Sequence, residues 1–280
     1  MFSRVLAAEF FKASYRVRLL FWGFVFVPIC SFAADIFILS NPIHLASITA
    51  RIDLLSLLSR ALEIGGSPLA QVFFIAAAAV IFGGEYDSET WRLLAPRARR
   101  PDWIWAKVLL YTAGVLCSLT LVALGALLCA LLESLTRFVP ITWQANGGSA
   151  ISALAAVFCI SWAELLLLGL VTGLLAVASR SALIATVSVI LLAFCQSILI
   201  SLVRVASVVS DNVSSAAKLA LLPGLAAQVT RFFATHAEVS PGMYITARQA
   251  SMGAASLFAW ISFTLFLTLA WFNRQELSRE

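Results

Sequence analysis

Long apolar stretches separated by short polar segments run along almost the whole chain. A membrane-spanning helix needs about 20 mostly apolar residues, because each residue adds about 1.5 Å across a hydrocarbon core about 30 Å thick. Six stretches reach or approach this length: residues 19–40, 68–84, 103–132, 151–179, 182–203 and 251–272. The pattern predicts an all-α polytopic membrane protein, in which six transmembrane helices form a single transmembrane domain, residues 1–280.

The segment before the first stretch has helical periodicity. In residues 2–18, apolar side chains recur at intervals of three or four, and polar side chains lie beside them. The apolar stripe contains Phe2, Leu6, Phe10, Ala13 and Val17, and the polar flank contains Glu9, Lys12 and Arg16. We predict an amphipathic helix on the inner membrane surface. The alternative is a basic flank that only fixes the orientation of the first span.

Two segments between the spans also carry apolar patterns. Residues 41–66 contain a second candidate surface helix, which we expect to cover the outer mouth of the bundle. Residues 218–222 and 225–233 are apolar but too short to cross a membrane, and Pro223-Gly224 separates them. Because proline removes an amide donor and glycine weakens a helix, we expect a broken, re-entrant hairpin on the outer side before the last span.

The composition excludes an ordinary soluble fold. Hydrophobic residues make up 61% of the chain and charged residues 12%, and the mean hydropathy is +0.97. Soluble domains have about 45–50% apolar and about 25% charged residues. The net charge of +5 does not indicate a nucleic-acid partner, because no basic stripe alternates with aromatic residues. In a membrane protein, positive residues gather in cytoplasmic loops.

The distribution of positive charge predicts the orientation. An even number of spans puts both termini on one side, and with that side inside, the inner segments hold twelve of the nineteen Lys and Arg residues. We therefore predict a multi-pass protein of the plasma membrane, a bacterial inner membrane, with both termini cytoplasmic. The first stretch is expected to be a retained span and not a signal peptide, since the region before it is long and contains Glu9.

The inner loop between the second and third stretches has the most informative polar pattern. Ser88, or the residue before it, can cap a short helix that acidic residues begin and Pro96 ends. Trp91 and Leu94 would share an apolar side of that helix. A large aromatic side chain at the membrane edge suits the docking of a soluble partner. The alternative is a solvated basic loop whose tryptophan lies among lipid headgroups.

Sequence motifs of catalysis are missing. The chain has no GxxxxGK[ST] phosphate-binding loop and no HExxH. Its five cysteines occur singly within the apolar stretches, without the spacing of metal ligands. We therefore predict that the chain is not an enzyme and holds no metal or cofactor of its own.

Two acidic residues lie inside predicted spans. Glu164 is midway along the fourth, where an unpaired charge costs about 2.5–3.5 kcal/mol, so it must be neutral, paired or beside a wet cavity. We favour a structural hydrogen bond to a neighbouring helix over a role in carrying substrate or protons. Asp35 is near the outer end of the first span and could reach the interface. Gly169-x-x-x-Gly173 permits close contact with another helix.

The order of several features resembles the membrane subunit, or permease, of ABC transporters of the ABC-2 type. That family has an acidic residue after the second span, then Gly-Thr, a short helix, Pro, a basic position and a Lys entering the third span. The corresponding residues here are Glu85, Glu89, Thr90, Arg92, Pro96, Arg97 and Lys107, with Glu89 where the family has glycine. Glu9 and Lys12 are similar to the Glu-x-x-Lys of the opening surface helix in that family, and Phe272-Asn273-Arg274 to its charged tail.

The resemblance implies a half-transporter. Two permease subunits, identical or related, would bind two cytosolic ATPase subunits that hold ATP and Mg²⁺, and the complex would export its cargo. Between the second and third spans, the cytoplasmic coupling helix would sit in a cleft of the ATPase. The residues implied in coupling are Glu85, Ser88, Glu89, Thr90, Trp91, Arg92, Leu94 and Pro96. The alternatives are a membrane scaffold or regulatory subunit that moves no cargo, and a secondary transporter that couples protons through Glu164.

Overall fold

The computed structural model describes residues 2–15, 17–40, 52–63, 67–86, 100–142, 150–209, 219–236 and 247–274. Within these ranges the chain forms ten α-helices, one π-helical segment and one pair of short strands. The elements are α1 (Phe2–Tyr15), α2 (Val17–Leu20), η1 (Phe21–Val25, π-helical), α3 (Phe26–Ser40), β1 (Ile52–Asp53), α5 (Leu54–Leu62), α6 (Pro68–Gly83), α8 (Arg100–Arg137), β2 (Ile141–Thr142), α9 (Ala150–Ser179), α10 (Ala182–Val209), α12 (Pro223–His236) and α13 (Ala247–Arg274).

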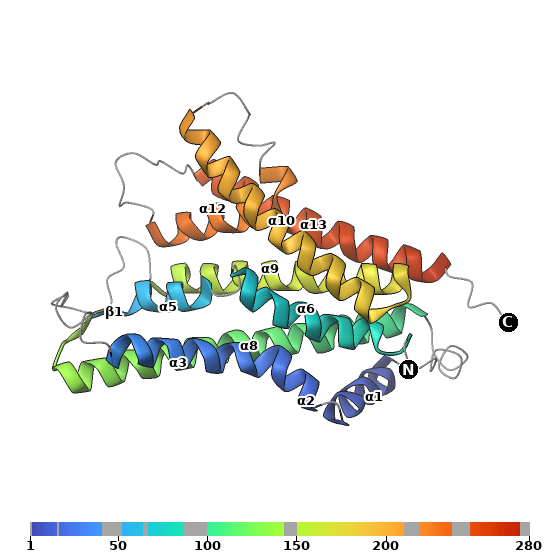
Figure 1. Cartoon of the computed structure of the whole chain (residues 1–280), viewed down its shortest axis with the longest axis horizontal. Helices are drawn as coiled ribbons and strands as arrows, with labels where there is room; N and C mark the ends of the chain where they lie inside the picture. Colours follow the sequence, from blue (N-terminus) through green and yellow to red (C-terminus); the bar gives the residue numbers. More distant parts are fainter. Residues whose placement is uncertain are drawn as a thin grey trace.

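The long helices form a bundle around α9 (Figure 1). This helix contacts α5, α6, α8, α10, α12 and α13, and it is apolar on all sides. A helix that is apolar all round is stable only where other helices or lipid cover every face. The sequence of α9 therefore suits the centre of the bundle.

Among the residues described above, five helices have the length and composition to cross a membrane: Phe21–Ile38, Pro101–Thr136, Ile151–Ser179, Ala182–Leu202 and Ala247–Arg274. They confirm five of the six predicted spans, although α8 and α10 extend several residues beyond the predicted ends. The sixth prediction, residues 68–84, forms the apolar helix α6, which has only 16 residues. Pro68 begins α6 and Gly83 and Gly84 end it, which limits its length.

The first predicted span is not one regular helix. A π-helical turn, η1, interrupts it, and the Phe26 amide donates to the Phe21 carbonyl. A Cβ atom on Gly23, inside η1, would lie 2.4 Å from the Cβ of Ala77 in α6. This close approach of the two helices requires glycine at position 23. The hydrophobic pattern of the first span predicts one regular helix and gives no signal for the π-helical turn.

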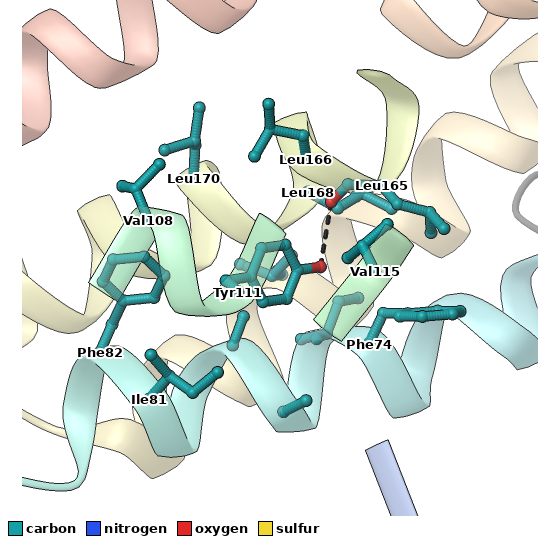
Figure 2. Packing of buried hydrophobic residues seen from close by; sticks show 14 of the residues in the cluster. Phe74, Ile81, Phe82, Val108, Tyr111, Val115, Leu165, Leu166, Leu168 and Leu170 are labelled. Carbon is teal, nitrogen blue, oxygen red and sulfur yellow. Dashed lines mark hydrogen bonds between the residues drawn. The ribbon is translucent and has the colours of Figure 1, made fainter. Parts of the chain in front are cut away.

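The largest buried cluster surrounds Tyr111 of α8 (Figure 2). The Tyr111 hydroxyl donates a 3.0 Å hydrogen bond to the Leu165 carbonyl of α9, so the polar atom of this buried ring has a partner. The ring lies on Gly169, and the ring of Phe82 lies on Gly173. The predicted close contact at Gly169-x-x-x-Gly173 is confirmed, with aromatic rings filling the space that the two missing side chains leave.

Replacing Gly169 by alanine should destabilise the bundle. The added Cβ would lie 2.1 Å from Cε1 of Tyr111, a buried ring whose hydroxyl is already fixed by a hydrogen bond. Overpacking of this kind costs about 1–3 kcal/mol. We expect a lower midpoint of heat-induced aggregation in detergent for Gly169→Ala.

The matched control is Gly125→Ala, where the nearest atom would be 3.4 Å away, an ordinary contact. Equal midpoints for the two variants would contradict the packing described here.

The N-terminal segment is helical as predicted, but its polar flank faces the protein. Val5 and Glu9 are buried, and Val5 packs on Trp103 and Ala106 of α8. Phe2, Phe10 and Val17 of the predicted apolar stripe remain exposed on the surface of the bundle. Glu9, predicted on the polar flank of a surface helix, is instead buried against the bundle. The positive charges of Lys12 on α1 and Lys107 on α8 compensate part of the cost of burying its carboxyl.

The segments predicted to cover the outer side pack closely on the bundle. Asp53 caps α5 by accepting a hydrogen bond from the Leu55 amide, and α5 packs on α8 and α9. The β1 strand pairs in parallel with β2. The predicted break at Pro223-Gly224 is confirmed, since α12 begins at Pro223 after the non-helical Leu222. The α12 helix then lies against α9 and α13.

Candidate functional site

Four charged residues from three separate parts of the chain meet at one end of the bundle. Glu9 and Lys12 come from α1, Glu85 follows α6, and Lys107 lies near the start of α8. The Lys12 ammonium group contacts Oε1 of Glu85, and Nζ of Lys107 lies 3.0 Å from its Oε2. Glu9, Glu85 and Lys107 are buried, and Lys12 is about one-third exposed. We call these four residues the ionic cluster.

Local structure explains why the cluster forms here. Glu9 and Lys12 are three residues apart on α1 and therefore share a face of that helix. The turn at 84–86, in which the Tyr86 amide donates to the Gly83 carbonyl, carries Glu85 back beneath the end of α6. Nζ of Lys107 also donates a 2.7 Å hydrogen bond to the Ile81 carbonyl. Since the last carbonyls of a helix lack internal partners and carry partial negative charge, Lys107 caps the C-terminal end of α6.

The two carboxyl groups have opposite protonation tendencies. Burial alone would raise the pKa of the Glu85 carboxyl, but the ammonium groups of Lys107 and Lys12 outweigh it and hold that pKa below its usual value. Burial raises the pKa of the Glu9 carboxyl, and the neighbouring Glu85 charge adds to this, while Lys107 and Lys12 oppose it. The arrangement therefore keeps Glu85 ionised between two cations and leaves Glu9 as the acid that more readily holds a proton.

The cluster lies at the base of the predicted coupling segment. Glu85 is the one implied coupling residue within the described ranges. Ser88, Glu89, Thr90, Trp91, Arg92, Leu94 and Pro96 lie outside them, so the predicted coupling helix is not tested. Sequence reasoning did not assign Glu9, Lys12 or Lys107 to the site. A lone lysine inside an apolar stretch is a signal that could have indicated a buried partner for Lys107.

A second buried ion pair lies at the centre of the bundle. Nη2 of Arg231, on α12, donates to Oε2 of Glu164, on α9, over 2.6 Å. Both side chains are more than nine-tenths buried. Of the states open to Glu164 from the sequence, the structure selects pairing with a neighbouring helix. Asp35 is half-buried on α3, in the second half of the first span.

Arg231 is the residue whose role the sequence analysis missed. It was counted among the basic residues of the outer segments, yet it lies in α12 against the middle of α9. The signal was available, because Arg231 is the one charged residue in the apolar run 225–233. An isolated charge in an apolar segment requires an opposite charge elsewhere in the chain.

Comparison with protein-family models, with curated proteins and with solved structures finds no significant match for this chain. The fold and the two ion-pair sites define its class by themselves. The chain is a multi-span helical membrane protein.

Proposed function

We propose that this protein is the transmembrane permease subunit of an ATP-driven ABC transporter of the ABC-2 type, an exporter whose separate ATPase subunits dock on residues 85–100. The observation that carries the proposal is the ionic cluster. Glu9, Lys12, Glu85 and Lys107 are four of the residues on which the resemblance to that family rests, and they meet in space. These residues belong to the same family resemblance and also contact one another, and we therefore infer that they have one common task.

That task is to stiffen the base of the coupling segment. The cluster joins α1 to the end of α6 and the start of α8. Residues 87–99 connect α6 to α8 along the chain. When both ends of a short segment are fixed to helices, a force on it moves the helices instead of deforming the loop. ATP held by the partner can drive this movement only through its different affinities for the open and closed ATPase dimer.

In the proposed topology the chain crosses the membrane six times, and α6 is the shortest crossing helix. Ten of its 16 residues are buried, so other helices, and not lipid, surround most of α6. The α1 helix and the C-terminal end of α13 lie at the same end of the bundle, as an even number of crossings requires (Figure 1). The basic residues favour the cytoplasmic side of a bacterial inner membrane for that end. The second permease subunit and the two ATPases complete the transporter.

The two alternative functions are weaker. A proton-coupled secondary transporter would use Glu164 as a free acid in its cycle, whereas the Glu164 carboxyl is buried in an ion pair with the Arg231 guanidinium. A scaffold subunit would dock a cytosolic partner without any movement of the spans. The experiment below separates the scaffold from the permease, because only a permease couples ATP hydrolysis to its own conformation.

Replacing Trp91 and Arg92 together by alanine should detach or uncouple the ATPase. We expect the chain to insert into the membrane normally, while its proposed ATPase partner no longer co-purifies with it, or hydrolyses ATP at a rate independent of it. The measurement is co-purification and ATP turnover of the two proteins co-expressed and reconstituted in nanodiscs.

Arg248→Ala, on the exposed start of α13, serves as the control for loss of positive charge. Unchanged co-purification and turnover in Trp91→Ala/Arg92→Ala would refute the coupling assignment. Tight docking with no response of ATP turnover to membrane reconstitution would favour the scaffold.

A further inference from the structure

A small polar chamber lies between α6, α9, α10 and α12, beside the midpoint of the central helix. Its volume is about 40 Å³. Five polar side chains line it among apolar ones: Gln71 from α6, Glu164 from α9, Gln196 and Ser197 from α10, and Gln228 from α12. Four helices each contribute at least one hydrogen-bonding group to the lining, beside the midpoint of the predicted fourth span. Polar residues at this depth are costly and indicate a function.

The chamber carries no net charge from the residues that the structure describes. Glu164 is the single ionisable side chain among the described lining residues, and Arg231 neutralises it. The other polar groups are carboxamides and a hydroxyl, which both donate and accept hydrogen bonds. An ion entering the chamber would lose its hydration without meeting a surplus of opposite charge, and that loss is expensive in a low-dielectric surrounding. The lining therefore suits a neutral group with hydrogen-bonding capacity.

The size of the chamber fits a few water molecules or one small polar group. A cavity needs at least about 10–15 Å³ for one water molecule, and the water needs two to four polar partners. The first turn of α12 forms a wall, since a Cβ on Gly224 would lie 2.4 Å from Nε2 of Gln196. The glycine thus lets the Gln196 amide rest against the backbone where the helix is broken. Pro223 and Gly224, at the start of α12, both line the chamber.

We propose that the polar chamber is a hydrated binding site for an uncharged hydrogen-bonding group, a hydroxyl or an amide, carried by the transported molecule. The reference to a transported molecule rests on the proposed function. The hydration of the chamber and its preference for neutral polar groups do not, because they follow from its lining alone.

Labelling of a single cysteine at position 197 tests the proposal. The background variant has the five native cysteines, all within helices, replaced by alanine. In nanodiscs, Ser197→Cys should react with the neutral hydroxyethyl methanethiosulfonate at least ten times faster than with the anionic sulfonatoethyl or the cationic trimethylammonium reagent. Leu191→Cys, on an exposed position of the same helix, is the control and should react slowly with all three, because lipid keeps its thiol neutral and dry.

Two results would overturn the proposal. Equal rates with all three reagents would mean an open aqueous vestibule without preference, and no reaction at position 197 would mean a dry packing defect. Neither result touches the coupling assignment, since the labelling uses neither ATPase nor cargo. Conversely, failure of the Trp91→Ala/Arg92→Ala experiment would leave the hydrated site in place and remove only its role in ATP-driven transport.

A second variant tests whether the labelling rate at position 197 depends on the chamber itself. Gly224→Ala in the Ser197→Cys background would push the Gln196 amide into the cavity, and we expect labelling by the neutral reagent to slow at least threefold. The matched Gly125→Ala change, which meets only an ordinary contact far from the chamber, should leave the rate unchanged. Equal labelling rates in the two glycine variants would show that the reagent reaches position 197 by another route and would refute the chamber as the site.

Discussion

Replacing Arg231 by methionine should strongly destabilise the protein. The substitution leaves the Glu164 carboxylate, which is more than nine-tenths buried at the centre of the bundle, without the guanidinium that lies 2.6 Å away. Breaking one side of a buried ion pair costs about 3–5 kcal/mol, because the remaining charge stays desolvated and uncompensated. We expect poor expression and a clearly lower midpoint of heat-induced aggregation for Arg231→Met in detergent.

The partner substitution makes this prediction specific. In Glu164→Gln/Arg231→Met both charges are gone, so most of the lost stability should return. Arg248→Met removes an exposed arginine from α13 and should have little effect. If Arg231→Met were as stable as Arg248→Met, the ion pair would not exist as described.

Glu164→Gln alone separates a structural role from a transport role. A change in transport with normal expression would show that the carboxyl takes part in the cycle, whereas reduced expression alone would identify it as a structural partner of Arg231.

Replacing Lys107 by methionine should have the second large effect. Lys107 is buried, neutralises Glu85 and caps the Ile81 carbonyl at the end of α6. Its loss leaves two buried carboxyl groups facing only the partly exposed Lys12, and one helix-end carbonyl without this donor. The expected loss is again about 3–5 kcal/mol. In the proposed transporter, the loss of this ionic link between α6 and α8 at the base of residues 87–99 should also make ATP turnover by the partner independent of this subunit.

Lys12→Met is the matched control, since it removes a contact to the same carboxyl of Glu85 but from a side chain that is about one-third exposed. Its effect on stability should be clearly smaller, because solvent screens the partly exposed Lys12 ammonium and can hydrate the site after its removal. A double-mutant cycle with Glu85→Gln measures each coupling. Equal losses for Lys107→Met and Lys12→Met would contradict the central position of Lys107 in the ionic cluster.

The sequence predicted the helical elements well where hydrophobicity alone decides them. Five predicted spans are confirmed, and α9, apolar on every side, is the helix that the others surround. The break at Pro223-Gly224 was also predictable, because the backbone chemistry of proline and glycine acts locally. The helical periodicity of residues 2–18 was correct as well.

The sequence could not predict which groups meet across the fold. On α1, the same periodicity is compatible with burying either face, and the buried one is chosen by Lys107 of α8 and Glu85 after α6. From the sequence, Arg231 belongs to an outer segment, whereas in the structure α12 packs on α9 and brings Arg231 to Glu164. Gly23, inside the π-helical turn at Phe21–Val25, lies against Ala77, a residue more than fifty positions further along the chain.

The sequence by itself determined that this is a multi-span helical membrane protein, where five of its long apolar helices lie and where one of its segments breaks. These properties depend on the transfer of neighbouring residues from water to an apolar surrounding and on local backbone chemistry. Only the tertiary structure decided the ionic cluster, the Glu164–Arg231 pair and the polar chamber. A buried charge or amide must find a partner, and in this chain those partners are dozens of residues away, where only the packing of whole helices can bring them.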